Sequence, residues 1–226
     1  MRRFGSLFLF VLLLGVAAGL ASAQSSVDVN VGLGAAQATA GPGFDTTTFM
    51  NCTATTTSCA KTPSLNSFFM GLGANLMLWE HLGFGGEANF QPVKQTFATL
   101  GSTGLGSTEK LQTRVTFYDF NAIFRPVNTP RANLLLAGGI GGANVRFYDS
   151  ISGSGSVLGS TNSSQFFSSS NHFQMHAGAG VQLYLTDKVF IRPQFDFRYV
   201  PNFVQFGRNT VTQGSVWIGY SLGERQ

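Results

Sequence analysis

The most constraining feature of the sequence is a pair of long alternating runs between His172 and Tyr199, separated by the short turn 186–188. Apolar residues occupy every second position over about eleven residues in each run, which is the period of a β-strand. The two runs therefore predict a β-hairpin. Strands in soluble sheets usually have about five to six residues, whereas a tilted strand needs about nine to eleven to cross a bilayer. The length of the arms thus favours a membrane-spanning hairpin.

The two faces of this hairpin differ in a way that favours a membrane barrel over a soluble one. One face is apolar, and the other combines charged side chains with glycines. A soluble ligand-binding barrel would turn its apolar face inward and its charges toward water. We expect the opposite here, with the apolar face in contact with lipid and the polar face lining a narrow lumen. The residues predicted to face lipid include Phe173, Val181, Leu183, Ile191, Phe195 and Phe197.

The start of the chain predicts export. Arg2 and Arg3 precede an apolar run that ends near Leu20, and Ala21-Ser22-Ala23 has the pattern of a cleavage site. We expect residues 1–23 to be a signal peptide and residues 24–226 to be the mature domain; a retained membrane anchor is the alternative. Beyond residue 24 no apolar run reaches the roughly eighteen residues of a spanning helix, so membrane insertion has to use strands.

The rest of the chain repeats the pattern of the hairpin. Only 11% of the residues are charged, which is low for a soluble protein. Long Gly/Ser/Thr-rich loops are expected at 37–66, 92–111 and 149–171, and they alternate with short turns. In hydrocarbon an open sheet edge is costly, so the first strand should pair with the last. The sequence predicts an all-β, eight-stranded antiparallel up-and-down transmembrane β-barrel with both termini on the periplasmic side. Its strands are expected near residues 26–36, 67–79, 82–91, 114–125, 133–148, 172–185, 189–199 and 211–222.

Three irregularities interrupt the alternation. Val115 and Phe117 fall on the parity opposite to the apolar residues that follow them, which predicts either a bulge or an exit of the strand from the lipid zone near Phe117. The strand at 133–148 changes parity midway, and a register break at its glycine cluster, residues 138–142, would reconcile its two halves. Pro193 removes a backbone donor in mid-strand, so we expect a bulge there or a lone carbonyl facing water.

Several segments carry a resemblance to a known family. GLGANLMLWEHLGFGGEANFQP, FYDFNAIFRP and the closing WIGYSLGER resemble the bacterial outer-membrane β-barrel family that includes the small OmpA-like and OmpX-like barrels. The resemblance covers nearly all of the mature chain and implies insertion into the outer membrane by the assembly machinery. The chain departs from the family in its last residues, 223–226, which lack the frequent terminal aromatic residue, and it has no peptidoglycan-binding domain.

Side chains fill an eight-stranded barrel, so the predicted function is structural, with a plugged lumen and a contact surface on the external loops. With the turn centred near Asp187, Arg198 should lie opposite His176, and Asp196 opposite Gly178, where Arg192 or Arg198 has room to reach the carboxylate. A small-solute, porin-like diffusion pore is the first alternative. The predicted lumen network of ion pairs and hydrogen bonds consists of Glu87, Asp119, Arg125, Arg146, Arg192, Asp196 and Arg198.

A lipid-modifying enzyme is the second alternative. Its only candidate cluster is His172 with Ser168, Ser169, Ser170 and Asp149. Ser-rich loops produce such clusters by chance, so we predict that the protein is not an enzyme and assign no catalytic residue. The inward positions of His172 and His176 lack a third metal ligand, so no metal or cofactor is expected.

The remaining features concern the loops and the partners. Cys52 and Cys59 are expected to form a local disulfide in the first long loop of an exported chain. Basic residues are scattered singly, which argues against nucleic-acid binding. The expected partners are outer-membrane lipids and, during biogenesis, the assembly machinery, and the barrel is expected to be a monomer.

Overall fold

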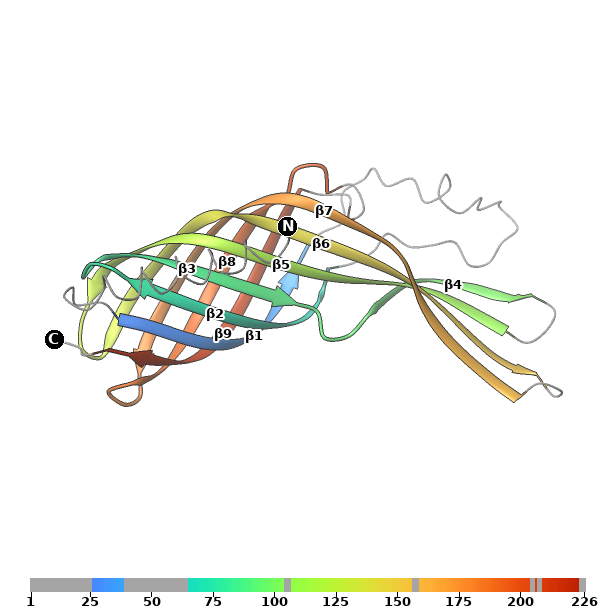
Figure 1. Ribbon diagram of the computed structural model, residues 1–226, viewed down its shortest axis with the longest axis horizontal. Helices are drawn as coiled ribbons and strands as arrows, with labels where there is room; N and C mark the ends of the chain where they lie inside the picture. The colour runs from blue at the N-terminus through green and yellow to red at the C-terminus, as the bar shows by residue number, and fades with distance from the viewer. Residues whose placement is uncertain are drawn as a thin grey trace, which may run out of the picture.

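The computed structural model describes residues 26–38, 65–103, 107–155, 159–203, 206 and 209–223, nearly all of them in antiparallel strands (Figure 1). The predicted signal peptide, residues 1–23, and the predicted disulfide between Cys52 and Cys59 lie outside these ranges. Within the described ranges, no helix is long and apolar enough to cross a membrane. The strands are β1 (Ser26–Gln37), β2 (Ser67–Met77), β3 (Leu82–Phe90), β4 (Gln95–Thr103), β5 (Ser107–Asn128), β6 (Ala132–Gly155), β7 (Gly159–Tyr184), β8 (Val189–Tyr199) and β9 (Thr210–Leu222).

Eight of the nine strands form a closed barrel. The sheet order is β3-β2-β1-β9-β8-β7-β6-β5-β4, and an additional pairing of β3 with β5 closes the ring and leaves β4 outside it. The first strand pairs with the last along its length, from Val27↔Leu222 to Gln37↔Thr212. Closure satisfies the backbone groups that an open edge would expose to hydrocarbon. The predicted eight-stranded up-and-down barrel is therefore confirmed.

Alternation decides which side of the wall each side chain occupies. Along β8, Phe195 and Phe197 are 57% and 43% exposed on the outer surface, whereas Arg192, Asp196 and Arg198 are fully buried inside. Phe173, Val181 and Leu183 of β7 are likewise exposed, and Ile191 of β8 is half-buried on the outer face.

Three strands are much longer than the membrane requires. β5, β6 and β7 have 22, 24 and 26 residues, and together with β4 they continue beyond the barrel as a four-stranded β-extension (Figure 1). The predicted loops 92–111 and 149–171 are thus wrong, because most of their residues are paired strands. Both faces of such an extension meet water, so its Ser, Thr and Asn residues follow no apolar period that the sequence could reveal.

Of the two alternatives predicted near Phe117, the bulge is wrong, and so is the register break predicted at the glycine cluster of β6. β5 and β6 pair in one unbroken register from Ser107↔Gly153 to Phe124↔Leu136. Val115, Phe117 and Val145 are instead fully buried inside the barrel. The change of parity therefore marks a change in the content of the lumen, from polar to apolar, and not a change of register.

Pro193 is accommodated without a bulge. The β7–β8 ladder runs from Met175↔Tyr199 to Gly180↔Gln194 and resumes at Leu183↔Ile191 in the same register, so only the pairs beside Pro193 are missing. The proline ring is exposed on the outer face. Its missing donor therefore costs a short gap in one ladder, while pairing with β9 continues through Pro193↔Val216.

The short turns at 78–81, 129–131 and 185–188 lie at the end of the barrel where β1 begins and β9 ends. The β-extension lies at the opposite end of the barrel, where β1 ends and β9 begins (Figure 1).

Candidate functional site in the barrel lumen

A large aromatic side chain lies against the inner wall of the barrel, over two glycines that leave space for it. Trp217 of β9 is fully buried, and its Nε1 donates to Ser215 Oγ at 2.9 Å. Gly32 of β1 and Gly71 of β2 lie in register beside it, and a Cβ atom at either position would collide with the indole. The glycines that give these strands their low side-chain volume therefore serve to seat the tryptophan.

Nearest the short turns, an ion pair spans the lumen from β5 to β1. Arg125 Nη2 donates to Asp28 Oδ2, and the Ser221 hydroxyl donates to Oδ1 of the same carboxylate. Gln182 Nε2 is 3.3 Å from Asp28 Oδ2. Asp28 is fully buried, so each of these donors offsets part of the cost of removing the carboxylate from water.

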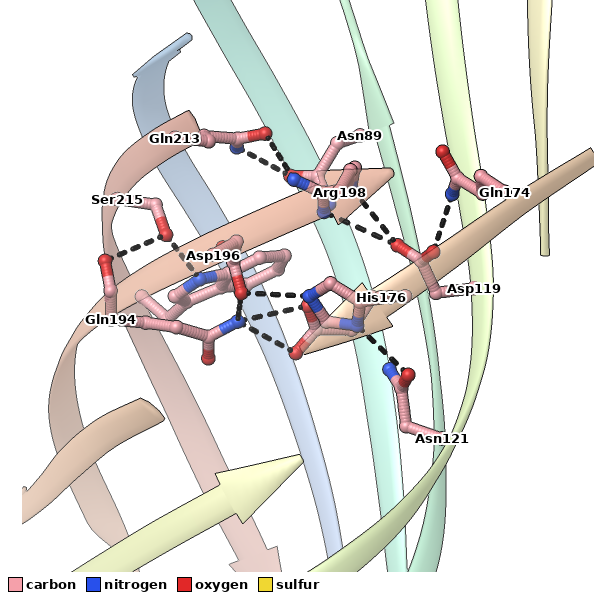
Figure 2. Close-up of polar contacts among 12 residues, drawn as sticks. Asn89, Asp119, Asn121, Gln174, His176, Gln194, Asp196, Arg198, Gln213 and Ser215 are labelled. Carbon is pink, nitrogen blue, oxygen red and sulfur yellow. Dashed lines mark hydrogen bonds and ion pairs between the residues drawn. The ribbon is translucent and has the colours of Figure 1, made fainter. Parts of the chain in front are cut away.

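The middle of the lumen holds a connected network. Arg192 Nη2 donates to Glu87 Oε1 at 2.8 Å, and Gln194 Nε2 lies 3.0 Å from Glu87 Oε2 and 2.7 Å from Asp196 Oδ1. His176 lies between Asp196 and Asn121, with Nε2 3.0 Å from Asp196 Oδ1 and Nδ1 2.8 Å from Asn121 Oδ1 (Figure 2). The Arg192 guanidinium also lies 5.3 Å from the centre of the Trp217 ring.

A third layer surrounds Arg198. Its Nε and Nη2 lie 3.3 Å and 3.2 Å from Asp119 Oδ2, and Gln174 also donates to that carboxylate (Figure 2). Arg198 Nη1 donates to Gln213 Oε1 at 2.9 Å, and Gln213 donates in turn to Asn89. The guanidinium stacks at 5.2 Å over the Phe117 ring, where the polar layers end.

Apolar clusters lie on both sides of these layers. Toward the β-extension, Phe69 stacks on Phe117 at 5.7 Å and Phe203 contacts Phe206 at 4.6 Å. Toward the short turns, a smaller cluster contains three buried residues, Met77, Ile123 and Leu135. The larger cluster comprises Ala36, Ala38, Leu65, Phe69, Val115, Phe117, Ala143, Val145, Val200, Phe203, Phe206 and Val211.

The charges of the described lumen nearly balance. Four carboxylates, three guanidinium groups and one imidazole are buried there. Each arginine pairs with its own carboxylate, and the fourth carboxylate, Asp196, contacts the imidazole of His176. Such pairing is the condition under which charges survive in a low-dielectric interior.

Six of the seven residues predicted for the lumen network lie inside the barrel: Glu87, Asp119, Arg125, Arg192, Asp196 and Arg198. Arg146 does not, because it occupies an outward position of β6, where it is exposed and donates to Asn144 Oδ1 at 3.0 Å.

The predicted register of His176↔Arg198 and Gly178↔Asp196 is confirmed. However, neither arginine of β8 forms an ion pair with Asp196 among the described residues, because Arg192 is held by Glu87 and Arg198 by Asp119.

Several lumen residues were not among the predicted ones. Asp28, the partner of Arg125, occupies a polar position of the alternating first strand, and that parity is the signal that could have identified it. The glutamines have the same signature, since Gln174, Gln182 and Gln194 occupy inward positions of β7 and β8. Their partners lie across the barrel, which no local pattern reveals.

The candidate catalytic cluster is only partly assembled. His172 Nε2 lies 3.0 Å from Ser170 Oγ, and its ring packs edge-on against Phe203 at 5.4 Å. Asp149 pairs with Gln165, whereas His172 pairs with Ala143, so the acid lies about 20 Å along the strand from the histidine. Among the described residues, no group of three His, Cys, Asp or Glu side chains could hold a metal ion.

A closed barrel that is apolar outside and holds layers of paired charges inside, and whose longest strands continue past the apolar zone, defines a class: transmembrane β-barrels of the outer membrane. The sequence matches the family model of the outer membrane protein beta-barrel domain over residues 6–222. The chain therefore belongs to this outer-membrane β-barrel family.

Solved structures of outer-membrane proteins are similar to this chain at low sequence identity. Ail, the attachment invasion locus protein of Yersinia pestis, crystallised with the heparin analogue sucrose octasulfate, aligns over 88% of this chain and 99% of its own, with 13% identity and a TM-score of 0.51. A major outer membrane protein from Thermus thermophilus aligns over 88% and 99%, with 11% identity and a TM-score of 0.49. No curated protein sequence matches at a significant level.

Proposed function

We propose that this protein is an outer-membrane barrel with a lumen closed by its own side chains, and that it acts through the external surface of its β-extension. The observation that supports the proposal is the burial of large and charged side chains at successive levels of the lumen. Three layers of paired charges lie between two apolar clusters, and Trp217 packs over Gly32 and Gly71 beside Arg192. A barrel of eight strands has an interior just wide enough for side chains to fill.

The β-extension supports a contact role. It continues β5, β6 and β7 well beyond the length a bilayer requires, and side chains such as Phe166 and Ile151 are 55% and 44% exposed on it. Ail, whose fold this chain shares, is by name an attachment protein, and an external contact role is in keeping with that name.

Conductance in planar lipid bilayers tests the closed lumen. The wild-type protein should give no stepwise openings. The double variant Trp217→Ala/Arg192→Ala, which removes two large neighbouring side chains from the lumen, should give flickering openings. Phe195→Ala, a truncation of an exposed outer residue, should remain silent. Defined openings of the wild type would contradict the proposal and favour the diffusion pore.

A further inference from the structure

The outer face of the β-extension carries a basic patch where the extension leaves the barrel. We define this patch as Lys94, Lys110, Arg114 and Arg146. Arg114 of β5 and Arg146 of β6 are direct cross-strand partners. The neighbouring Val115 and Val145 are fully buried inside, so alternation turns both arginines outward. Arg146 is exposed and Arg114 half-buried.

The arginine pair lies just beyond the apolar surface of the barrel. Tyr118 and Phe120 of β5 and Ile140 of β6 are 48%, 63% and 57% exposed there. Arg114 is four residues beyond Tyr118, which is about 13 Å along the strand and about 10 Å along the membrane normal for a strand tilted by about 40°. This distance places the pair at the depth of the lipid headgroups.

No carboxylate neutralises the pair within the described part of the chain. Arg114 Nη2 donates to the Pro92 carbonyl at 2.5 Å, and Arg146 Nε donates to Asn144 Oδ1. The ion pairs among the described residues include neither arginine. The nearest acid along β6, Asp149, lies on the opposite face of the strand. Like charges directly opposite each other across two strands are unfavourable, so an anion that bridges them would be stabilising.

The surroundings of the pair suit a phosphate group. Lys94 reaches across the same face, with Nζ 4.1 Å from the centre of the Tyr148 ring and 2.6 Å from Ser164 Oγ. Asn144 Nδ2 donates to Asn171 Oδ1 at 2.6 Å on the other side of the pair. Guanidinium groups bind phosphate oxygens through pairs of parallel N–H donors, and a bilayer presents phosphate at this depth.

We propose that Arg114 and Arg146 together bind a phosphate group on the headgroup of an outer-leaflet lipid, with Lys94 as an additional positive charge. The site lies outside the lumen and does not depend on whether the lumen is closed. It anchors the base of the β-extension at the membrane surface.

Lipid binding by the folded protein tests the proposal. The protein is reconstituted in nanodiscs of uncharged lipid and titrated with phosphorylated lipid A, with the same lipid A after removal of its phosphates, and with inorganic phosphate. The wild-type protein should bind the phosphorylated lipid at least about tenfold more tightly than the dephosphorylated one, since each basic residue contributes to anionic-lipid attraction. Arg114→Gln/Arg146→Gln should lose this preference.

The matched control is Arg131→Gln/Lys188→Gln, which removes the same charge from two exposed turn residues at the other end of the barrel and should keep the preference. Heat-modifiable gel mobility verifies that each variant is folded. A preference that survives in Arg114→Gln/Arg146→Gln, or that is lost equally in the control, would overturn the site. Tight binding of inorganic phosphate that abolishes lipid binding would overturn the lipid as its source.

Discussion

Buried arginines are the side chains of this barrel that are costliest to leave unpaired. Arg192, Arg198 and Arg125 each face a carboxylate, and the first two are fully buried. Taken alone, such a pair adds little stability, because desolvation of both charges offsets their attraction. Removal of one partner is different, since the other charge is then buried without compensation.

Arg192→Met should lower the free energy of unfolding by about 3–5 kcal/mol, because it leaves Glu87 without its guanidinium partner. Urea unfolding of the reconstituted protein measures the change. Arg131→Met, at an exposed turn position, is the control and should change stability by less than about 0.5 kcal/mol. Equal effects of the two substitutions would show that Arg192 is not held in a dry interior.

Glycine at position 32 is required by the approach of the Trp217 indole and not by backbone conformation. Gly32→Ala should destabilise the protein by about 1–3 kcal/mol, the usual cost of overpacking. At Gly214, on the outer face, a Cβ would meet nothing within 4 Å, so Gly214→Ala should be neutral or slightly stabilising. Both values come from the same unfolding experiment, and a neutral Gly32→Ala would place the indole elsewhere.

Among the elements, the strands of the barrel could be predicted from the sequence, whereas the strands of the β-extension could not. Strands that contact lipid on one face show a period of two, and β7 and β8 were predicted from it together with their register. The extension has water on both faces and therefore no such period, so its strands resembled loops. The lumen partners escaped prediction for another reason: Asp28 and Arg125 are 97 residues apart, and the pairing depends on how the closed ring is staggered.

The same distinction explains the parity changes in β5 and β6. Apolar residues on the inner face, such as Phe117 and Val145, looked like errors of register because the lumen was expected to be polar throughout. Arg146 was assigned to the lumen for the same reason, although strict alternation with the buried Val145 puts it outside.

The outer part of the β-extension should be dispensable for barrel formation. Residues 149–155 and 159–165 pair within the extension or with one another, and the ring is closed by other pairings. Replacement of 149–165 by a short Gly-Ser turn should therefore leave heat-modifiable mobility intact and change the free energy of unfolding by about 1 kcal/mol or less. Failure of this variant to fold in detergent or lipid would mean that the extension is part of the folding unit.

For the whole molecule, the pairing that closes the barrel also sets the width of the lumen that the side chains occupy. Pairing of β1 with β9 removes the open edges, and the ring it makes is narrow enough for Trp217, the charged layers and the phenylalanines to occupy its interior. The described outer surface then carries a broad band of exposed apolar side chains, with the basic patch immediately beyond it. The outer face of the barrel wall thus contacts lipid, and the inner face contacts the side chains of other strands.

The two tryptophans of the chain provide the most direct test, because one is exposed in a short turn and the other is buried inside the barrel. Trp79 is 62% exposed beside a short turn, whereas Trp217 is fully buried in the lumen. Fluorescence is measured in bilayers of brominated lipid and, separately, with aqueous iodide, for the wild type and for Trp79→Phe. The fluorescence of Trp79→Phe comes from Trp217. Each agent should quench it far less than it quenches the fluorescence of the wild type. Strong quenching of Trp217 by iodide would reveal a water-filled lumen, and strong quenching by brominated lipid would place it on the outer face; either result would contradict a barrel filled by its own side chains.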